Sequence, residues 1–140
     1  MDAREFMEKF NARCAEIGAK LRLSPMPDYE AKKGDRLTPL RLTPRVSCVY
    51  GAGYAQIIAE GRAPAAVAEG LTAFCMALDT LMGVAEEVRN GYLRRLNLFN
   101  GRLAPSGAQT NARGFTLSVR PNNPSPGLVS YIISARSAPA

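Results

Sequence analysis

The sequence predicts an α+β domain in which an antiparallel sheet of about four strands packs on one long central helix, with an amphipathic helix at the N-terminus. Three observations predict this fold. An apolar stripe of helical period runs through residues 64–90, a strand-like pair of segments lies on each side of it, and a shorter helical stripe opens the chain. The predicted element order is therefore α-ββ-α-ββ, with one sheet and the helices on one of its faces.

Length and composition predict a single domain, residues 1–140, because 140 residues with 46% hydrophobic side chains can bury an ordinary core. No window holds 18 uninterrupted apolar residues, and the charged start MDAREFMEKF is unlike a signal peptide. The three cysteines, Cys14, Cys48 and Cys75, lie among apolar neighbours, as is typical of a reducing compartment. We therefore expect a cytoplasmic protein with no membrane partner.

The first helix is predicted over residues 2–22. Phe6, Phe10 and Cys14 recur at helical spacing and mark one apolar face. Asp2 is suited to cap the first turn, because an aspartate before a helix accepts hydrogen bonds from its free backbone N–H groups. This helix is expected to cover part of the sheet.

A linker and arm follow over residues 24–45. Within it, the stretch RLTPLRLTPR at 36–45 contains the motif RLTP twice. Pro39 and Pro44 exclude a helix and favour an edge strand or a polyproline-like arm that could cross to another subunit. The two copies are five residues apart, so in a regular strand they would point to opposite faces. The repeat is therefore not a pair of equivalent binding units.

Residues 45–59 are predicted to form a hairpin, with strands at 45–50 and 54–59 joined by a glycine turn at 51–53. The alternative is a strand followed by a glycine turn and a short helix. Gly51 and Gly53 also resemble the first two glycines of a dinucleotide-binding turn, but Gln56 holds the third position and the βαβ context is missing. The hairpin is the favoured interpretation.

The long helix is predicted over residues 64–90, or as far as 98, with Pro64 in its first turn. Its stripe consists of residues three or four apart: Val67, Leu71, Phe74, Leu78, Leu81, Ala85, Val88 and Tyr92. The stripe could be a dimer seam, but regular flanking charge pairs are missing, so we interpret it as the face that packs on the sheet. A homo-oligomer is still expected, whether or not this helix forms the contact between subunits.

The C-terminal part is predicted to be a loop over residues 100–113 and a hairpin over 114–136. Alternating apolar residues define strands at 114–120 and 128–136, joined by the turn-rich PNNPSPG. In that hairpin Arg120 would lie near the start of the second strand and Arg136 near its other end.

No catalytic site is predicted. The chain has no histidine, which removes the commonest general base, nucleophile activator and metal ligand, and it has no CxxC pair for zinc. The acids of the long helix are interpreted as a solvated face, with Glu86 able to pair with Arg89; they are Glu69, Asp79, Glu86 and Glu87. We expect a protein that is not an enzyme and needs no metal or cofactor.

Charge is divided unevenly along the chain. Residues 1–87 carry all 12 acids and a net charge of −1, whereas residues 88–140 carry seven arginines, no lysine and no acid. Arginine offers a rigid fork of donors for phosphate and carboxylate groups, and nearby aromatic rings can stack on a base. The candidate ligand-binding residues are Arg89, Tyr92, Arg94, Arg95, Phe99, Arg102, Arg113, Arg120 and Arg136.

The sequence thus predicts a small binding protein, possibly homo-oligomeric, that uses an arginine-rich C-terminal region to hold a phosphate-bearing ligand, either a nucleotide or a nucleic acid. The alternative is an interaction or inhibitor protein that docks on an acidic surface of a host protein. Small size, basic character and the lack of catalytic residues are typical of accessory proteins of phages and other mobile elements.

Overall fold

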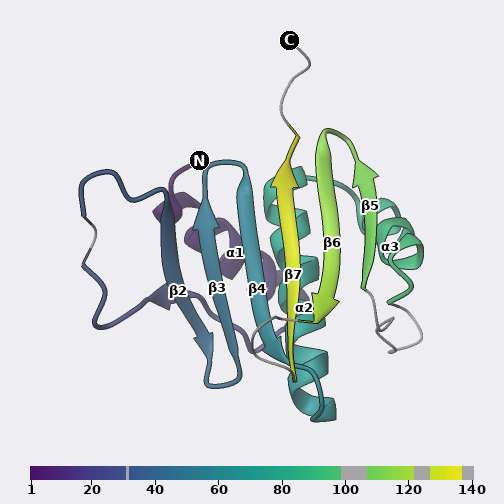
Figure 1. Cartoon of the computed structure of the whole chain (residues 1–140), viewed down its shortest axis with the longest axis horizontal. Helices are drawn as coiled ribbons and strands as arrows, with labels where there is room; N and C mark the ends of the chain where they lie inside the picture. Colours follow the sequence, from purple (N-terminus) through teal and green to yellow (C-terminus); the bar gives the residue numbers. More distant parts are fainter. Residues whose placement is uncertain (31, 99–106, 122–126, 137–140) are drawn as a thin grey trace.

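The computed structural model describes residues 1–30, 32–98, 107–121 and 127–136. Over these residues the chain forms a seven-stranded antiparallel sheet and three helices (Figure 1). The helices are α1 (Ala3–Ile17), α2 (Pro64–Met82) and α3 (Glu86–Arg95), and the strands are β1 (Ser24–Pro25), β2 (Leu37–Thr43), β3 (Val46–Gly51), β4 (Tyr54–Glu60), β5 (Ala108–Ala112), β6 (Phe115–Pro121) and β7 (Leu128–Ala135). The strand order across the sheet is β1-β2-β3-β4-β7-β6-β5.

The predicted class is right in being α+β, but the prediction of about four strands on one long central helix is wrong. Both predicted hairpins form, as β3 with β4 and as β6 with β7. The sheet also contains three strands beyond those of the predicted hairpins. Strands β1 and β2 extend it at one end, with two-residue β1 at the edge, and β5 extends it at the other end. Segment 24–45 is thus partly a strand of the sheet, and residues 108–112 of the predicted loop are a strand.

The predicted long helix is two helices. Gly83 ends α2 in the left-handed conformation, with φ of 62°, and its N–H donates to the carbonyl of Asp79. A glycine adopts this conformation without the steric cost of a Cβ, which is why it often stands just past a helix end. Helix α3 begins at Glu86, so the apolar stripe continues from α2 into α3 across a short non-helical segment.

The sheet consists of two meanders joined at one seam. Strands β1 to β4 follow one another from one edge to the middle, and β5 to β7 follow one another from the other edge inward. Strand β4 pairs with β7, with Ala55 opposite Ile133. Figure 1 shows β4 and β7 side by side at the centre, with α2 behind them.

The core lies between the sheet and the helices. Phe6 and Phe10 of α1 are fully buried, and the Phe6 ring stacks on Tyr50 of β3 at 4.5 Å. Asp2 caps α1 as predicted, accepting a hydrogen bond from the Glu5 N–H at 2.8 Å. Helix α2 lies very close to β4, because a Cβ built on Gly70 would stand only 2.6 Å from that of Ala59.

Helix α2 is long and apolar enough to cross a membrane by length and composition alone. The central helix of a soluble protein has the same composition, and Phe74 and Leu78 of α2 are fully buried in the core described above. This points to a soluble protein.

The other face of the sheet is open. In Figure 1, α1 and α2 lie behind the strands, and none of the described helices covers the face turned towards the viewer. Along β4 the side chains alternate, with Ala55, Ile57 and Ala59 buried towards the helices and their neighbours half-buried on the open face. The sheet therefore presents a broad surface that the helical layer leaves available.

Candidate functional site: the open face of the sheet

The open face carries mostly uncharged side chains. By register, the residues on this side of the central strands are Tyr54, Gln56, Ile58 and Glu60 on β4, Leu128, Ser130, Ile132 and Ser134 on β7, and Thr116, Ser118 and Arg120 on β6. Ser130 and Ile132 of this set are buried. Serine, threonine and glutamine thus stand beside isoleucine and tyrosine. A face that is poor in charge and mixes polar with apolar groups resembles the centre of a recognition surface.

A chain of hydrogen bonds crosses this face from β4 to β7. The Tyr54 hydroxyl donates to Gln56 Oε1 at 2.9 Å, and Gln56 Nε2 donates to Ser130 Oγ at 3.1 Å. Ser130 is buried, with 3% of its surface exposed. Because the Tyr54 hydroxyl bonds to a residue two positions along its own strand, the Tyr54 side chain extends along β4 towards Gln56 and is half-buried.

Arg120 completes this group, which we call the open-face cluster: Tyr54, Gln56, Arg120 and Ser130. Arg120 lies directly opposite Ser130 in the β6–β7 register and is exposed. Burial raises the pKa of Tyr54 above its ordinary value, and the positive charge of Arg120 opposes that rise. The strand register thus places one cation beside the hydrogen-bonded chain of Tyr54, Gln56 and Ser130.

The other described site residues lie in two groups, one on α3 and one at the far end of the sheet. Arg89 and Tyr92 are buried on α3, so neither is available at the surface. Arg94 and Arg95 lie exposed in the last turn of α3, with the Arg95 guanidinium 5.1 Å from the centre of the Tyr92 ring. Phe99 and Arg102 lie outside the described residues.

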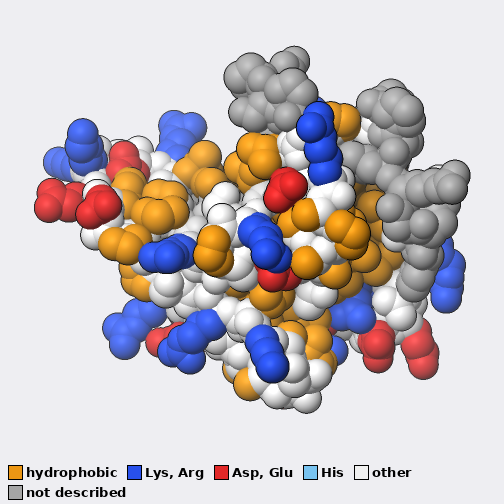
Figure 2. Space-filling model, turned by 90° about the horizontal axis from the view of Figure 1, so that it is seen from below, with side chains coloured by type: hydrophobic (Ala, Val, Ile, Leu, Met, Phe, Trp, Pro, Cys, Tyr) orange, Lys and Arg blue, Asp and Glu red, His pale blue; other side chains and the backbone are white. Residues whose placement is uncertain are grey.

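Arg113 and Arg136 are exposed at the end of the sheet away from Arg120. The N–H of Arg136 donates to the carbonyl of Gly114, next to Arg113, at 2.7 Å. In Figure 2, lysine and arginine side chains are spread over the face seen from below and do not gather in one patch. The acid-free region thus supplies several separate cationic positions, of which Arg120 alone belongs to the open-face cluster.

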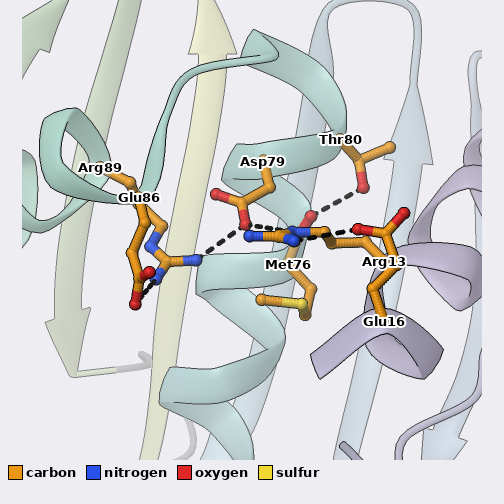
Figure 3. Close-up of polar contacts among 7 residues, drawn as sticks. All are labelled: Arg13, Glu16, Met76, Asp79, Thr80, Glu86 and Arg89. Carbon is orange, nitrogen blue, oxygen red and sulfur yellow. Dashed lines mark hydrogen bonds and ion pairs between the residues drawn. The ribbon is translucent and has the colours of Figure 1, made fainter. Parts of the chain in front are cut away.

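A second polar group, missed by sequence reasoning, joins the three helices (Figure 3). Asp79 Oδ2 accepts hydrogen bonds from Arg13 Nε at 2.9 Å and from Arg89 Nη1 at 2.8 Å. Glu16 approaches Arg13 to 3.0 Å, and Glu86 approaches Arg89 to 3.6 Å, as the spacing of Glu86 and Arg89 predicts. Five alternating charges therefore connect α1, α2 and α3.

The interpretation of Asp79 as part of a solvated face is wrong. Its side chain is only 5% exposed, and that of Arg89 is 9% exposed. The signal was present in the sequence, because Glu69 and Asp79 are the only charged residues of the otherwise apolar stretch 64–82. A lone acid near the end of an apolar helix is expected to need a buried partner.

This charged network is structural in character. A hollow of about 410 Å³ lies beside it, lined in part by Lys9, Arg13 and Asp79. However, Asp79 Oδ1 and Arg89 Nε, which have no hydrogen-bond partner among the described residues, are both enclosed by protein. A molecule in the hollow would therefore not reach them unless α3 moved.

The cysteines are poor nucleophiles in this fold. Burial raises the pKa of Cys48 to about 12 and that of Cys75 to about 11, so both thiols stay protonated at neutral pH. Among the described residues, no three or more metal-ligating side chains come together.

No protein-family model matches the chain, and no curated protein or solved structure is significantly similar to it.

Proposed function

We propose that this is a non-enzymatic binding protein that holds a phosphate-bearing ligand, a nucleotide or a nucleic acid, on the open face of its sheet. The observation that carries the proposal is the exposed Arg120 opposite Ser130, which hydrogen bonds connect to Gln56 and Tyr54, on a face that the described helices leave uncovered. Arginine binds phosphate oxygens through two parallel N–H donors, and an aromatic ring on a sheet can stack on a base.

The electrostatics of the face support an anionic ligand. Among the described residues that point to this side of β2, β4 and β6, the charged ones are Arg41, Glu60 and Arg120, so cations outnumber acids. Because the neighbouring positions are uncharged, a bound phosphate would meet little repulsion, and only Glu60 would oppose it.

The spacing of the two arginines distinguishes the two ligand classes. Arg41 and Arg120 stand in one row of the sheet, which runs through Ser47, Ile58 and Ser130. Four strand-to-strand steps separate them, or about 19 Å. One mononucleotide cannot place its phosphates on both, whereas an oligonucleotide that crosses the strands can.

The test is fluorescence anisotropy at low salt with a labelled single-stranded oligonucleotide and with a labelled nucleoside triphosphate. Arg120→Ala should weaken binding by about tenfold to a hundredfold, since a hydrogen bond to a charged group contributes about 1.5 to 3 kcal/mol. Arg41→Ala should weaken only the oligonucleotide. The matched control is Arg4→Ala, which removes an exposed arginine of α1.

Binding of the oligonucleotide should also fall steeply with salt, and Arg120→Ala should lower that salt dependence by about one released counterion. The proposal fails if neither probe binds, or if Arg4→Ala weakens binding as much as Arg120→Ala does.

We also infer a cytoplasmic location, since the three cysteines are free and two of them are fully buried in the core. Cell fractionation with a reporter-tagged chain would test this.

A further inference from the structure

The last strand of the sheet, β5, has a free edge. Its two-residue turn, Arg113–Gly114, places Ala112 opposite Phe115. In such a hairpin the pair beside the turn exchanges hydrogen bonds and the next pair does not, so the backbone groups of alternate residues point outward. Those residues are Gln109 and Asn111, and within the described chain β5 pairs with β6 alone.

The sequence and register of β5 lack the features that usually protect an edge strand. The strand AQTNA has no proline and no charge, and its register with β6 has no bulge. The opposite edge is different, because two-residue β1 contains Pro25 and the strand beside it contains Pro39, Arg41 and an irregular register. Natural proteins normally blunt an edge with such features, and an edge without them can accept another strand.

The charge nearest to β5 in the sequence is basic. Arg113 is exposed at one end of the strand, and α3, which packs beside it, begins with Glu86 and Glu87 and ends with Arg94 and Arg95. The sequence from residue 88 to 140 contains no acid. Pairing of β5 with β5 of a second copy would bring like charges together, whereas an acidic strand would be attracted.

Arg113 also has a backbone conformation that its side chain does not favour. Its φ is 46°, in the left-handed region, and the first position of this turn normally holds asparagine, aspartate or glycine. An arginine at this position therefore costs local stability. Such outliers are more readily understood where the side chain has a function.

We propose that the free edge of β5 binds an extended acidic segment of another protein as an additional antiparallel strand. Backbone groups of Gln109 and Asn111 make the ladder, and Arg113 contacts the acidic side chains. This mode gives affinity through the main chain and selects the partner through charge. It uses a different surface from the open-face cluster and does not depend on the phosphate-bearing ligand.

The test uses a short synthetic peptide of alternating glutamate and valine, with a lysine–valine peptide as its charge control. Binding is followed by the backbone amide signals in the NMR spectrum of the isotope-labelled full chain, and by amide hydrogen exchange. The acidic peptide should bind, should protect the Gln109 and Asn111 amides, and should bind more weakly as salt rises. The lysine peptide should not bind.

Two substitutions at one position separate the backbone from the side chain. Asn111→Pro removes an outward N–H but no backbone hydrogen bond to β6, and should weaken binding at least tenfold. Like Asn111→Ala, it also removes the side-chain hydrogen bond that Asn111 Oδ1 accepts from the Thr116 hydroxyl, so the alanine variant controls for that loss. Asn111→Ala keeps the N–H and should bind as the parent does. If Asn111→Pro does not fold, as judged by its amide spectrum, Gln109→Pro takes its place.

The charge is tested with Arg113→Asn, which suits the left-handed turn and removes the cation, so that any loss of binding is not a loss of folding. It should weaken the acidic peptide severalfold, and Arg113→Lys should restore most of the affinity. The proposal is overturned if the acidic peptide does not bind, if the lysine peptide binds equally, or if the proline and alanine variants behave alike. Oligonucleotide binding should be unchanged in Asn111→Pro, so failure here and failure of the phosphate site are distinguishable.

Discussion

Asp79 shows how one residue can organise three helices. It projects from α2, close to the Gly83 break, and one of its oxygens receives donors from both α1 and α3. Burying a carboxylate or a guanidinium alone is costly, because the charge loses its hydration. Separating the buried pair would leave each charge without a partner, and this cost keeps the two side chains together. The network therefore acts mainly to fix where α3 restarts.

Removing this carboxylate should be strongly destabilising. We expect Asp79→Ala to lower the free energy of unfolding by about 3 kcal/mol or more, because Arg89 is left charged and buried. Urea unfolding at neutral pH measures the change. Glu16→Gln is the control, and it should cost less than about 1 kcal/mol because Glu16 is largely exposed. Equal losses in the two variants would contradict a structural role for Asp79.

The thiol of Cys48 makes stability depend on alkaline pH. Its pKa is raised by burial from 9.0 to about 12 in the folded chain. Below pH 9 the thiol is protonated in both states, and its contribution to stability is complete. Between pH 9 and 12 only the unfolded chain loses this proton, so the free energy of unfolding should fall by about 1.4 kcal/mol per pH unit from this group.

The prediction is tested by comparing Cys48→Ala with the parent. The quantity to compare is the slope of the free energy of unfolding against pH, because the absolute stability of Cys48→Ala is also lowered by the cavity that it leaves. Under reducing conditions, the variant should lose stability less steeply than the parent between pH 9 and 11, by the equivalent of one proton. Parallel curves for the two proteins would show that Cys48 does not titrate as expected.

At the residue scale the sequence predicts apolar positions better than polar ones. Phe6, Phe10 and Cys14 are buried as their spacing predicts. Asp79 and Arg89 were assigned to the surface because helical spacing alone does not show which acid meets a cation from another helix. Their partners are 66 and 10 residues away along the chain, and only the tertiary fold brings them together.

At the scale of elements, tight turns were the most informative signals. The glycine turn at 51–53 predicts the β3–β4 hairpin, and the alternating apolar residues of β6 and β7 predict the second one. Strand β5 was missed because AQTNA has no alternating large apolar residues, and its extended form depends on pairing with β6. The helix end at Gly83 was missed, because the apolar stripe keeps its helical spacing on both sides of it.

Two glycines of the α2–α3 region should respond in opposite ways to the same substitution. Gly83→Ala should destabilise the chain by about 1 to 2 kcal/mol, because an alanine is disfavoured in the left-handed conformation even where space is open. Gly91→Ala should stabilise it by about 0.5 to 1 kcal/mol, since Gly91 lies inside α3 with open space around its Cα.

Thermal and urea unfolding of both alanine variants would measure this pair. Gly83→Asn should recover part of the loss, because asparagine tolerates the left-handed region. A stabilising Gly83→Ala would mean that α2 and α3 can join as one helix, which the break at Gly83 argues against.

At the scale of the whole molecule, the fold has one core, between the helices and the sheet, and two surfaces apart from it, the open face of the sheet and the edge of β5. The described helices cover one face of the sheet and leave the other uncovered, while β5 is the last strand at one edge. The separation of Arg120 from Arg136 follows from the predicted hairpin, and the fold distributes the described arginines of residues 88–140 among the open face, α3 and the far end of the sheet. Which of them act together is decided by strand register.

The seam between β4 and β7 has a consequence for how the chain folds. Every other pair of neighbouring strands in the described sheet is consecutive along the sequence, whereas Ala55 must find Ile133. Closing so long a loop is slow compared with forming a hairpin. Until it closes, each meander exposes an inner edge that only the other meander can cover. The slowest step of folding is therefore also the moment at which two newly made chains can most easily exchange halves.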